Sequence, residues 1–222
     1  MADRFAVNDR PIELPNEAHV CLTLVIDVSG SMSSVIGDVN SGVNRMIDEL
    51  KQDGRLSSVL DMSIITFCDK GAHKVIQPFQ SIKSTSPVNL TTGSTTFAVD
   101  ALELARANTS HQKARYQSGC MKPWIVFITD GYIHDDLTDI GIKFKRDELE
   151  GKYHVLCFGV GAAYAPKQLA LLSSTCFQII NYNFADFFSW IGKSQAVISQ
   201  AAIGANTNLP ATGAICQLSI TA

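Results

Sequence analysis

The chain has 222 residues, of which 46% are apolar, so it is long enough for one sizeable domain core and short for two. Its 18 basic and 21 acidic residues give a net charge of -3 without any basic block, and we therefore expect no nucleic-acid partner. The six cysteines are widely spread, form no Cys-x-x-Cys pair and lie partly in apolar runs, which favours buried thiols in a reducing cytosol over disulfides.

Residues 1–18 contain Pro11 and Pro15 and are predicted to form an extended lead-in to the domain. They carry acids as well as bases and lack an apolar central segment, so we do not expect a signal peptide. No uninterrupted apolar stretch approaches the roughly 18 residues that a membrane-spanning helix needs. We therefore expect a cytoplasmic protein without a membrane span.

An apolar run opens the domain and ends in polar residues. Residues 19–28 are rich in β-favouring side chains and are predicted to form a buried strand. Residues 33–52 then place apolar side chains at helical spacing, with Gly54 as a stop signal just beyond them. We expect a strand that is followed directly by a one-faced helix.

Two further strands and a polar loop follow. Residues 58–68 and 72–82 have strand-like patterns, and Pro78 favours an edge position for the second of them. A loop rich in Thr, Ser and Gly spans residues 84–94. Thr96 stands where the N-cap of the next helix would be, so we expect that helix to begin at the end of the loop.

The second half of the chain continues the alternation. Strands are predicted over residues 124–131, 153–160 and 176–180, and helices over about 138–150, from Pro166 and from about Asp186. His154 and Trp190 are expected to lie in the core.

Strands that alternate with helices predict an α/β fold. We expect a mostly parallel sheet of about six strands, with one short antiparallel edge strand and helices on both faces. We assign residues 19–203 to this domain and residues 204–222 to a C-terminal tail.

Two aspartates stand at the ends of predicted strands, Asp27 at the end of the first and Asp130 at the end of the fourth. In mostly parallel sheets, sites form beyond the carboxyl ends of the strands where the strand order reverses. Ser29 and Ser31 alternate with smaller or apolar residues after Asp27, so all three side chains can converge. If the two strands are neighbours, Asp130 adds a fourth oxygen and the hydroxyl of Thr96 a fifth. Five oxygen donors without Cys or His suit Mg²⁺, Mn²⁺ or Ca²⁺ rather than zinc.

These residues carry a resemblance to a known family. Asp27-x-Ser29-x-Ser31, Thr96 and Thr129-Asp130-Gly131 together resemble the metal-ion-dependent adhesion site of von Willebrand factor type A domains. The resemblance covers roughly residues 19–209. Three further segments are similar to small stand-alone bacterial members of the TerY/YegL type, namely residues 63–67, 122–130 and 187–190.

The resemblance implies a Rossmann-like sheet with a divalent ion on top, held by Asp27, Ser29, Ser31, Thr96 and Asp130. It also implies a non-enzymatic module that binds a partner protein through an Asp or Glu carboxylate on that ion. TerY-type proteins are cytoplasmic and linked with tellurite or other stress resistance. They often stand beside a kinase-like protein and a PP2C-type phosphatase.

Other interpretations of the same residues stay open. Family members more often have paired glycines where this chain has Gly93-Ser-Thr-Thr96, which leaves Thr95 as an alternative ligand. Asp27 and Thr96 could instead act only as helix caps. The main rival function is a metal-dependent phosphohydrolase with Asp27 as nucleophile. Such enzymes need a second acid two residues later, and because Ser29 stands there, we favour the binding module.

Four further polar residues follow the ends of predicted strands, namely Asp69, His134, Asp135 and Asp136. Their position makes them candidates for the rim of the metal site. We nevertheless favour solvated loops for all four, because charged loop residues are mostly exposed.

Overall fold

The computed structural model describes residues 17–161, 165–203, 208–212 and 216–218. Most of the predicted lead-in and part of the predicted tail lie outside the described residues. Within the described part of the chain, no helix is both long and apolar enough to cross a membrane.

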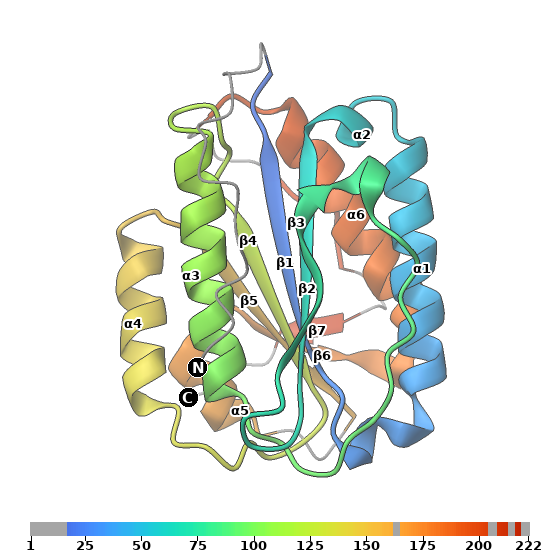
Figure 1. The fold of residues 1–222 in the computed structure, drawn as a ribbon, viewed down its shortest axis with the longest axis vertical. Coiled ribbons are helices and arrows are strands. Elements are labelled where there is room, and N and C mark those ends of the chain that lie inside the picture. The colour runs from blue at the N-terminus through green and yellow to red at the C-terminus, as the bar shows by residue number, and fades with distance from the viewer. Residues whose placement is uncertain (1–16, 162–164, 204–207, 213–215, 219–222) are drawn as a thin grey trace.

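One sheet forms the centre of the structure (Figure 1). Its strands are β1 (Val20–Asp27), β2 (Leu60–Phe67), β3 (Lys74–Ser81), β4 (Trp124–Thr129), β5 (His154–Val160), β6 (Cys176–Ile179) and β7 (Cys216–Leu218). They lie in the order β3-β2-β1-β4-β5-β6-β7. The inner strands pair in parallel, whereas β3 and β7 pair antiparallel at the two edges. The predicted α/β class and the mostly parallel sheet are confirmed.

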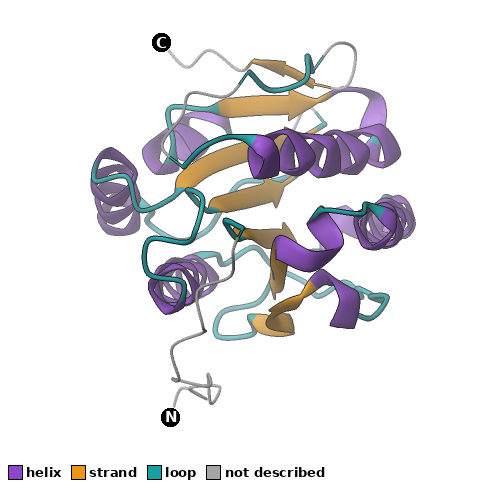
Figure 2. Cartoon of the chain, turned by 90° about the horizontal axis from the view of Figure 1, so that it is seen from above, coloured by secondary structure: helices purple, strands orange, loops and turns teal. Residues whose placement is uncertain are grey.

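Six α-helices flank the sheet among the described residues. They are α1 (Ile36–Gln52), α2 (Leu56–Val59), α3 (Val99–Arg115), α4 (Thr138–Leu149), α5 (Pro166–Leu172) and α6 (Phe184–Gln200), with short 3-10 turns at Gly30–Ser34, Ile82–Ser84 and Ile180–Tyr182. The view from above shows a helical layer on each side of the sheet (Figure 2). Helices α1, α2 and α6 share one hydrophobic cluster, and α3, α4 and α5 share the other.

Strand β1 explains why the sequence pattern is so uniformly apolar. All eight of its residues are buried, because both faces of the strand are covered. Leu24 and Ile26 pack in the cluster with α1 and α6, whereas Val25 between them packs in the cluster with α3.

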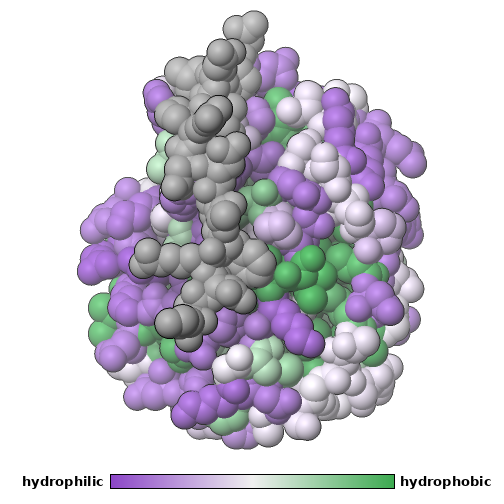
Figure 3. Space-filling model, in the orientation of Figure 1, coloured by the Kyte–Doolittle hydropathy of each residue, from purple (hydrophilic) through white to green (hydrophobic). Residues whose placement is uncertain are grey.

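Polar side chains cover most of the surface visible in Figure 3, and an apolar area lies near the middle of that face.

The order of the strands reverses at β1. From β1 the chain passes to β2 on one side and later returns to β4 on the other side. Strand β1 pairs in parallel with β4, from Leu22 opposite Trp124 to Ile26 opposite Ile128. The carboxyl ends of these two strands are therefore neighbours, which places Asp27 and Asp130 at one edge of the sheet.

Strand β3 is the antiparallel edge strand that Pro78 indicated. The sheet has one strand more than expected, because β7 pairs with β6. This strand lies in the segment 204–222 that we assigned to a tail. Residues 58–59 belong to the short helix α2 rather than to β2, which begins at Leu60.

Two predictions about single residues are wrong. Helix α3 begins at Val99 and has Ala98 at its N-cap position, so Thr96 is not the cap of this helix. His154 is exposed rather than buried, because it is the first residue of β5 and lies at the margin of the sheet, 3.8 Å from the carboxylate of Glu148. Trp190 does lie in the core, tilted against Trp124 and edge-on to Phe158.

A buried carboxylate joins α4 to its neighbours. Asp147 accepts hydrogen bonds from Nε of Arg106 at 2.6 Å, Nζ of Lys152 at 2.8 Å and the hydroxyl of Tyr153 at 2.9 Å. Burial alone would raise the pKa of the Asp147 carboxyl, but the hydrogen bonds from Lys152, Arg106 and Tyr153 outweigh burial and lower the pKa to about 2. The ionised carboxylate therefore stabilises the folded state.

We predict that Asp147→Asn lowers the free energy of unfolding by about 3 kcal/mol at pH 7, because it leaves Arg106 without its buried partner. The pKa of this carboxyl is lower in the folded protein than the roughly 3.9 of an unfolded chain. Its contribution is therefore complete above pH 4 and is lost as the pH falls toward 2. Urea unfolding of both proteins between pH 7 and pH 2 measures this difference.

The matched control is Asp139→Asn, on the exposed side of the same helix. It should change the free energy of unfolding by less than about 0.5 kcal/mol at any pH. A constant difference between Asp147→Asn and wild type down to pH 2 would contradict the assigned role of the charge.

Candidate metal centre

The floor of the site is Asp27, the last residue of β1. Its side chain is fully buried, and both carboxylate oxygens accept hydrogen bonds. Oδ1 accepts from the backbone amide of Ser29 at 2.7 Å, and Oδ2 accepts from the hydroxyl of Thr129 at 2.6 Å. Thr129 is the last residue of β4, so these bonds connect the ends of the two neighbouring strands.

Three further oxygen-bearing side chains lie between the buried carboxylate of Asp27 and the surface. The hydroxyl oxygens of Ser29 and Ser31 lie 3.1 Å apart, and the hydroxyl of Ser31 donates to Oδ1 of Asp130 at 2.7 Å. Ser29 is buried, whereas Ser31 is exposed. The 3-10 turn that begins at Gly30 brings Ser31 back toward Ser29 and Asp130. The structure thus brings together the four ligands predicted at the ends of β1 and β4.

Thr96 reaches the same place from the loop before α3. A Cβ atom built on Gly131 would lie 3.7 Å from the hydroxyl oxygen of Ser31 and 4.0 Å from that of Thr96. Thr96 is only 5% exposed. The hydroxyl of Thr95 instead donates to Oδ1 of Asp69 at 2.7 Å, on the exposed side of the loop. Of the two threonines that the sequence left open, the geometry therefore favours Thr96.

The threonine loop is held against the end of β1 by its backbone. The amide of Gly93 donates to the carbonyl of Val28 at 2.7 Å, and the amide of Gly30 donates to the carbonyl of Ser94 at 3.0 Å. A Cβ atom on Gly93 would lie 2.6 Å from Sγ of Cys68, which is too close for any side chain at this position. Gly93, the single glycine of this loop, is therefore required at the point where the loop approaches Cys68 most closely.

Two of the residues that we expected in solvated loops hold the threonine loop in place. The Asp69 carboxylate accepts from the amide of Thr95 at 2.8 Å and from that of Ser94 at 3.3 Å. These hydrogen bonds from Thr95 lower the pKa of the Asp69 carboxyl. The amide of His134 donates to the carbonyl of Thr96 at 2.9 Å, and Nδ1 of His134 lies 3.1 Å from the same oxygen. The sequence signal for Asp69 and His134 is that each of them follows the end of a predicted strand.

Asp135 has a role that the sequence did not indicate. Its Oδ2 atom accepts from the amides of Ala98 at 2.6 Å and Val99 at 2.8 Å, so it caps α3 from a distant loop. This is why α3 needs no cap from Thr96. Asp136 is exposed and accepts hydrogen bonds from Thr138, as expected for a loop residue at the start of a helix.

Asp27 and Asp130 have no positively charged partner among the described residues. Burial raises the pKa of the Asp27 carboxyl to about 6, against the opposing hydrogen bonds from Thr129 and Ser29, and burial also raises the pKa of the Asp130 carboxyl. Among the described residues, no Lys, Arg or His forms an ion pair with either of them. A cation at this place would offset the cost of burying the two charges.

The residues present fit a hard divalent ion. They offer two carboxylates and three hydroxyls, all of them oxygen donors, at the end of a buried strand. No cluster of three or more His, Cys, Asp and Glu side chains in the described ranges could hold a metal ion. A metal centre here therefore depends on the hydroxyls of Ser29, Ser31 and Thr96 as well as on Asp27 and Asp130.

Known structures share this architecture. The pilus adhesin SpaC of Lactobacillus rhamnosus GG aligns at 15% identity over 84% of this chain and 31% of its own, with a TM-score of 0.63. The vWF domain of the pilus tip protein Mfa5 of Porphyromonas gingivalis aligns at 12% identity over 85% of this chain and 98% of its own, with a TM-score of 0.60. Proximal thread matrix protein 1 of the mussel byssus, solved with a zinc-occupied MIDAS motif, aligns at 16% identity over 81% of this chain, with a TM-score of 0.55.

At these identities the likeness to solved structures concerns the fold. The chain spans 47% of the length of the mussel protein. Comparison with curated protein sequences finds no match. The model of the von Willebrand factor type A domain matches residues 22–196, which is most of the chain and contains all five predicted ligands. The chain therefore belongs to the von Willebrand factor type A domain family.

Proposed function

We propose that this chain is a metal-dependent protein-binding module that holds Mg²⁺ with Asp27, Ser29, Ser31, Thr96 and Asp130. One observation carries the proposal. Hydrogen bonds connect the fully buried carboxylate of Asp27, through the backbone amide of Ser29 and the hydroxyls of Ser29 and Ser31, with the carboxylate of Asp130. With no described cationic side chain paired to either carboxylate, a divalent ion supplies the charge that balances them.

The donor set favours Mg²⁺, with Mn²⁺ or Ca²⁺ as alternatives. The mussel protein with a zinc-occupied MIDAS motif supports a divalent ion at the corresponding place in this fold. The proposed ligands of this chain contain neither Cys nor His, which are the side chains that zinc sites usually use. Hydroxyl and carboxylate oxygens suit the harder ions.

The layout of the site favours a protein ligand from outside. Asp27 and Ser29 are buried, whereas Ser31 is exposed and Asp130 is half-buried, so the site opens toward solvent on their side. An ion held by two carboxylates and neutral hydroxyls keeps a coordination position on that side. We propose that an Asp or Glu carboxylate of a partner protein fills it.

We propose no catalytic activity for this site. A phosphohydrolase would need Asp27 as nucleophile, yet this carboxylate is fully buried and both of its oxygens accept hydrogen bonds. Ser29 also stands where such an enzyme needs its second acid. Both features favour a structural ligand over a nucleophile.

Within the family, we place the chain in the small stand-alone TerY/YegL type, because residues 63–67, 122–130 and 187–190 are similar to it. This placement implies a cytoplasmic protein of tellurite or other stress resistance, with kinase-like and PP2C-type phosphatase proteins as candidate partners. The thiols support the location. The five cysteines whose side chains the structure describes are free and buried, including Cys21 and Cys120, whose sulfur atoms lie 3.7 Å apart.

The first test removes the buried carboxylate of Asp27. We expect Asp27→Ala to abolish the heat of Mg²⁺ or Mn²⁺ binding in titration calorimetry, while circular dichroism shows the wild-type fold. Asp27→Asn should behave in the same way, because it keeps the size of the side chain and removes the charge. Asp38→Ala, an exposed acid on α1, serves as the matched control and should bind metal like wild type. Equal affinity of wild type and Asp27→Ala would exclude the assigned ligand set.

The second test separates the two threonines. Thr96→Ala should weaken Mg²⁺ binding about tenfold or more, because it removes a hydroxyl that faces the centre. Thr95→Ala should have a smaller effect, because that hydroxyl bonds Asp69 on the outside of the loop. Thr96→Ser should restore most of the affinity. If Thr95→Ala proves the more damaging change, the ligand assignment moves to Thr95.

The third test concerns the partner. Wild-type protein used as bait in an extract of its native cell should retain a partner with Mg²⁺ and release it on addition of a chelator. Asp27→Asn bait should retain none of that partner under either condition. A partner that stays bound in chelator, or that binds both baits equally, would mean that the metal site does not mediate the interaction.

A further inference from the structure

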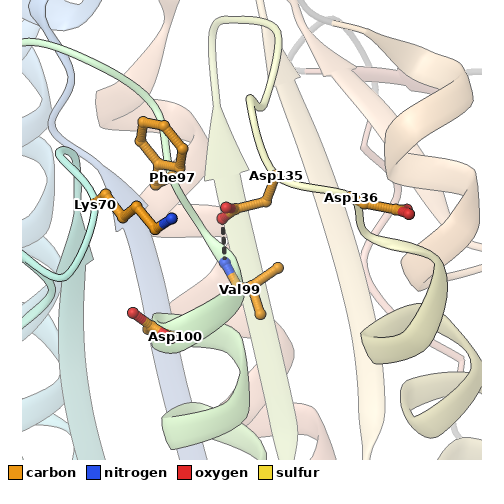
Figure 4. A pocket seen from close by; sticks show the side chains of 6 residues that line it. All are labelled: Lys70, Phe97, Val99, Asp100, Asp135 and Asp136. Atoms are coloured by element: carbon orange, nitrogen blue, oxygen red, sulfur yellow. Dashed lines mark hydrogen bonds between the residues drawn. The ribbon is translucent and has the colours of Figure 1, made fainter.

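A second feature lies next to the metal centre. A pocket of about 310 Å³ is lined by Lys70, Phe97, Val99, Asp100, Asp135 and Asp136 (Figure 4). Its lining continues the loops that build the metal site, since Lys70 follows Asp69 and Phe97 follows Thr96. The volume lies at the lower end of the roughly 300–1,000 Å³ of small-ligand sites, which suits one side chain better than a larger molecule.

The pocket has an excess of negative charge. Three carboxylates line it against one ammonium group, which leaves two negative charges in excess. Within the described part of the chain, neither Lys70 nor Asp100 forms an ion pair or a side-chain hydrogen bond. Asp135 is engaged by the two amides at the start of α3, as the dashed contact to Val99 in Figure 4 shows, and Oδ1 of Asp136 accepts hydrogen bonds from Thr138. These carboxylates are not arranged to hold a metal ion, in the part of the chain that the structure describes.

Aromatic rings connect this pocket with the metal centre. The ring of Phe97 stacks on His134, with centroids 5.4 Å apart, and His134 meets Tyr132 edge-on at 6.4 Å. Tyr132 stands two residues after the proposed ligand Asp130 and is 64% exposed. An aromatic face beside carboxylates that have no cationic partner among the described residues is the environment that a guanidinium group prefers, because it can stack on a ring while its N–H groups bind oxygens.

We propose that this pocket, built by Phe97, Asp100 and Asp136, receives a basic side chain, best an arginine, from the protein whose carboxylate binds the metal ion. The inference rests on the proposed function, which it makes more specific. The metal centre selects an acidic residue of the partner, and the neighbouring pocket selects a basic residue of the same segment. The binding face therefore recognises a pair of opposite charges rather than any exposed acid.

A display library of short random peptides, each with one fixed glutamate, tests this. Selection on wild-type protein with Mg²⁺ should enrich arginine at one fixed spacing from the glutamate, and a chelator should release the selected peptides. Asp100→Asn should weaken the best peptide about threefold, as expected for one exposed ion pair. Asp100→Lys should weaken it further and abolish the enrichment of arginine in a repeated selection.

The matched controls are Asp139→Asn and Asp139→Lys. Asp139 is an exposed acid in the first turn of α4, as Asp100 is in the first turn of α3, but it does not line the pocket. Both should bind the selected peptide like wild type. Metal-dependent peptides without a basic residue would overturn the pocket assignment and leave the metal function intact. If no metal-dependent peptide is selected, both the pocket assignment and the proposed metal-dependent binding function are overturned.

Discussion

Strand β1 pairs in parallel with β2 on one side and with β4 on the other, and this pairing positions the candidate site. Because the chain leaves β1 toward one side of the sheet and returns to β4 on the other, the loops after these two strands meet at one edge. The hydroxyl oxygen of Thr129 then lies 2.6 Å from Oδ2 of Asp27, although 102 positions separate the two residues in the sequence. Every other part of the site is arranged around this contact.

A buried carboxylate at such an edge has to be satisfied from several directions. Backbone and hydroxyl groups bond Asp27, while Asp69 and His134 hold the loop that carries Thr96. Asp135 meanwhile supplies the cap that α3 would otherwise need from its own chain. In the proposed arrangement, the same loops orient oxygens toward a metal ion and leave rings and carboxylates on the outside. The two proposed recognition features therefore need no additional elements beyond the sheet and its loops.

Much of the fold follows from local pattern. Continuous apolar runs predicted the central strands because both faces of the sheet are covered, and Pro78 predicted the edge because proline cannot donate a sheet hydrogen bond. The predictions failed where the environment of a residue depends on contacts with distant parts of the sequence. His154 has the neighbours of a core residue in sequence but lies at the margin of the sheet, and β7 gains its place only through pairing with β6.

The family, the parallel sheet and the five proposed oxygen donors could all be inferred from the sequence, because these depend on residue type and short spacing. The folded structure alone favours Thr96 over Thr95 as the proposed ligand, since the two hydroxyls face different sides of the loop. It likewise decided that Asp135 caps α3 and that Phe97, Asp100 and Asp136 line one pocket. These relations join loops that are distant in sequence. Their distances are set by the packing of the whole sheet, and no local pattern encodes them.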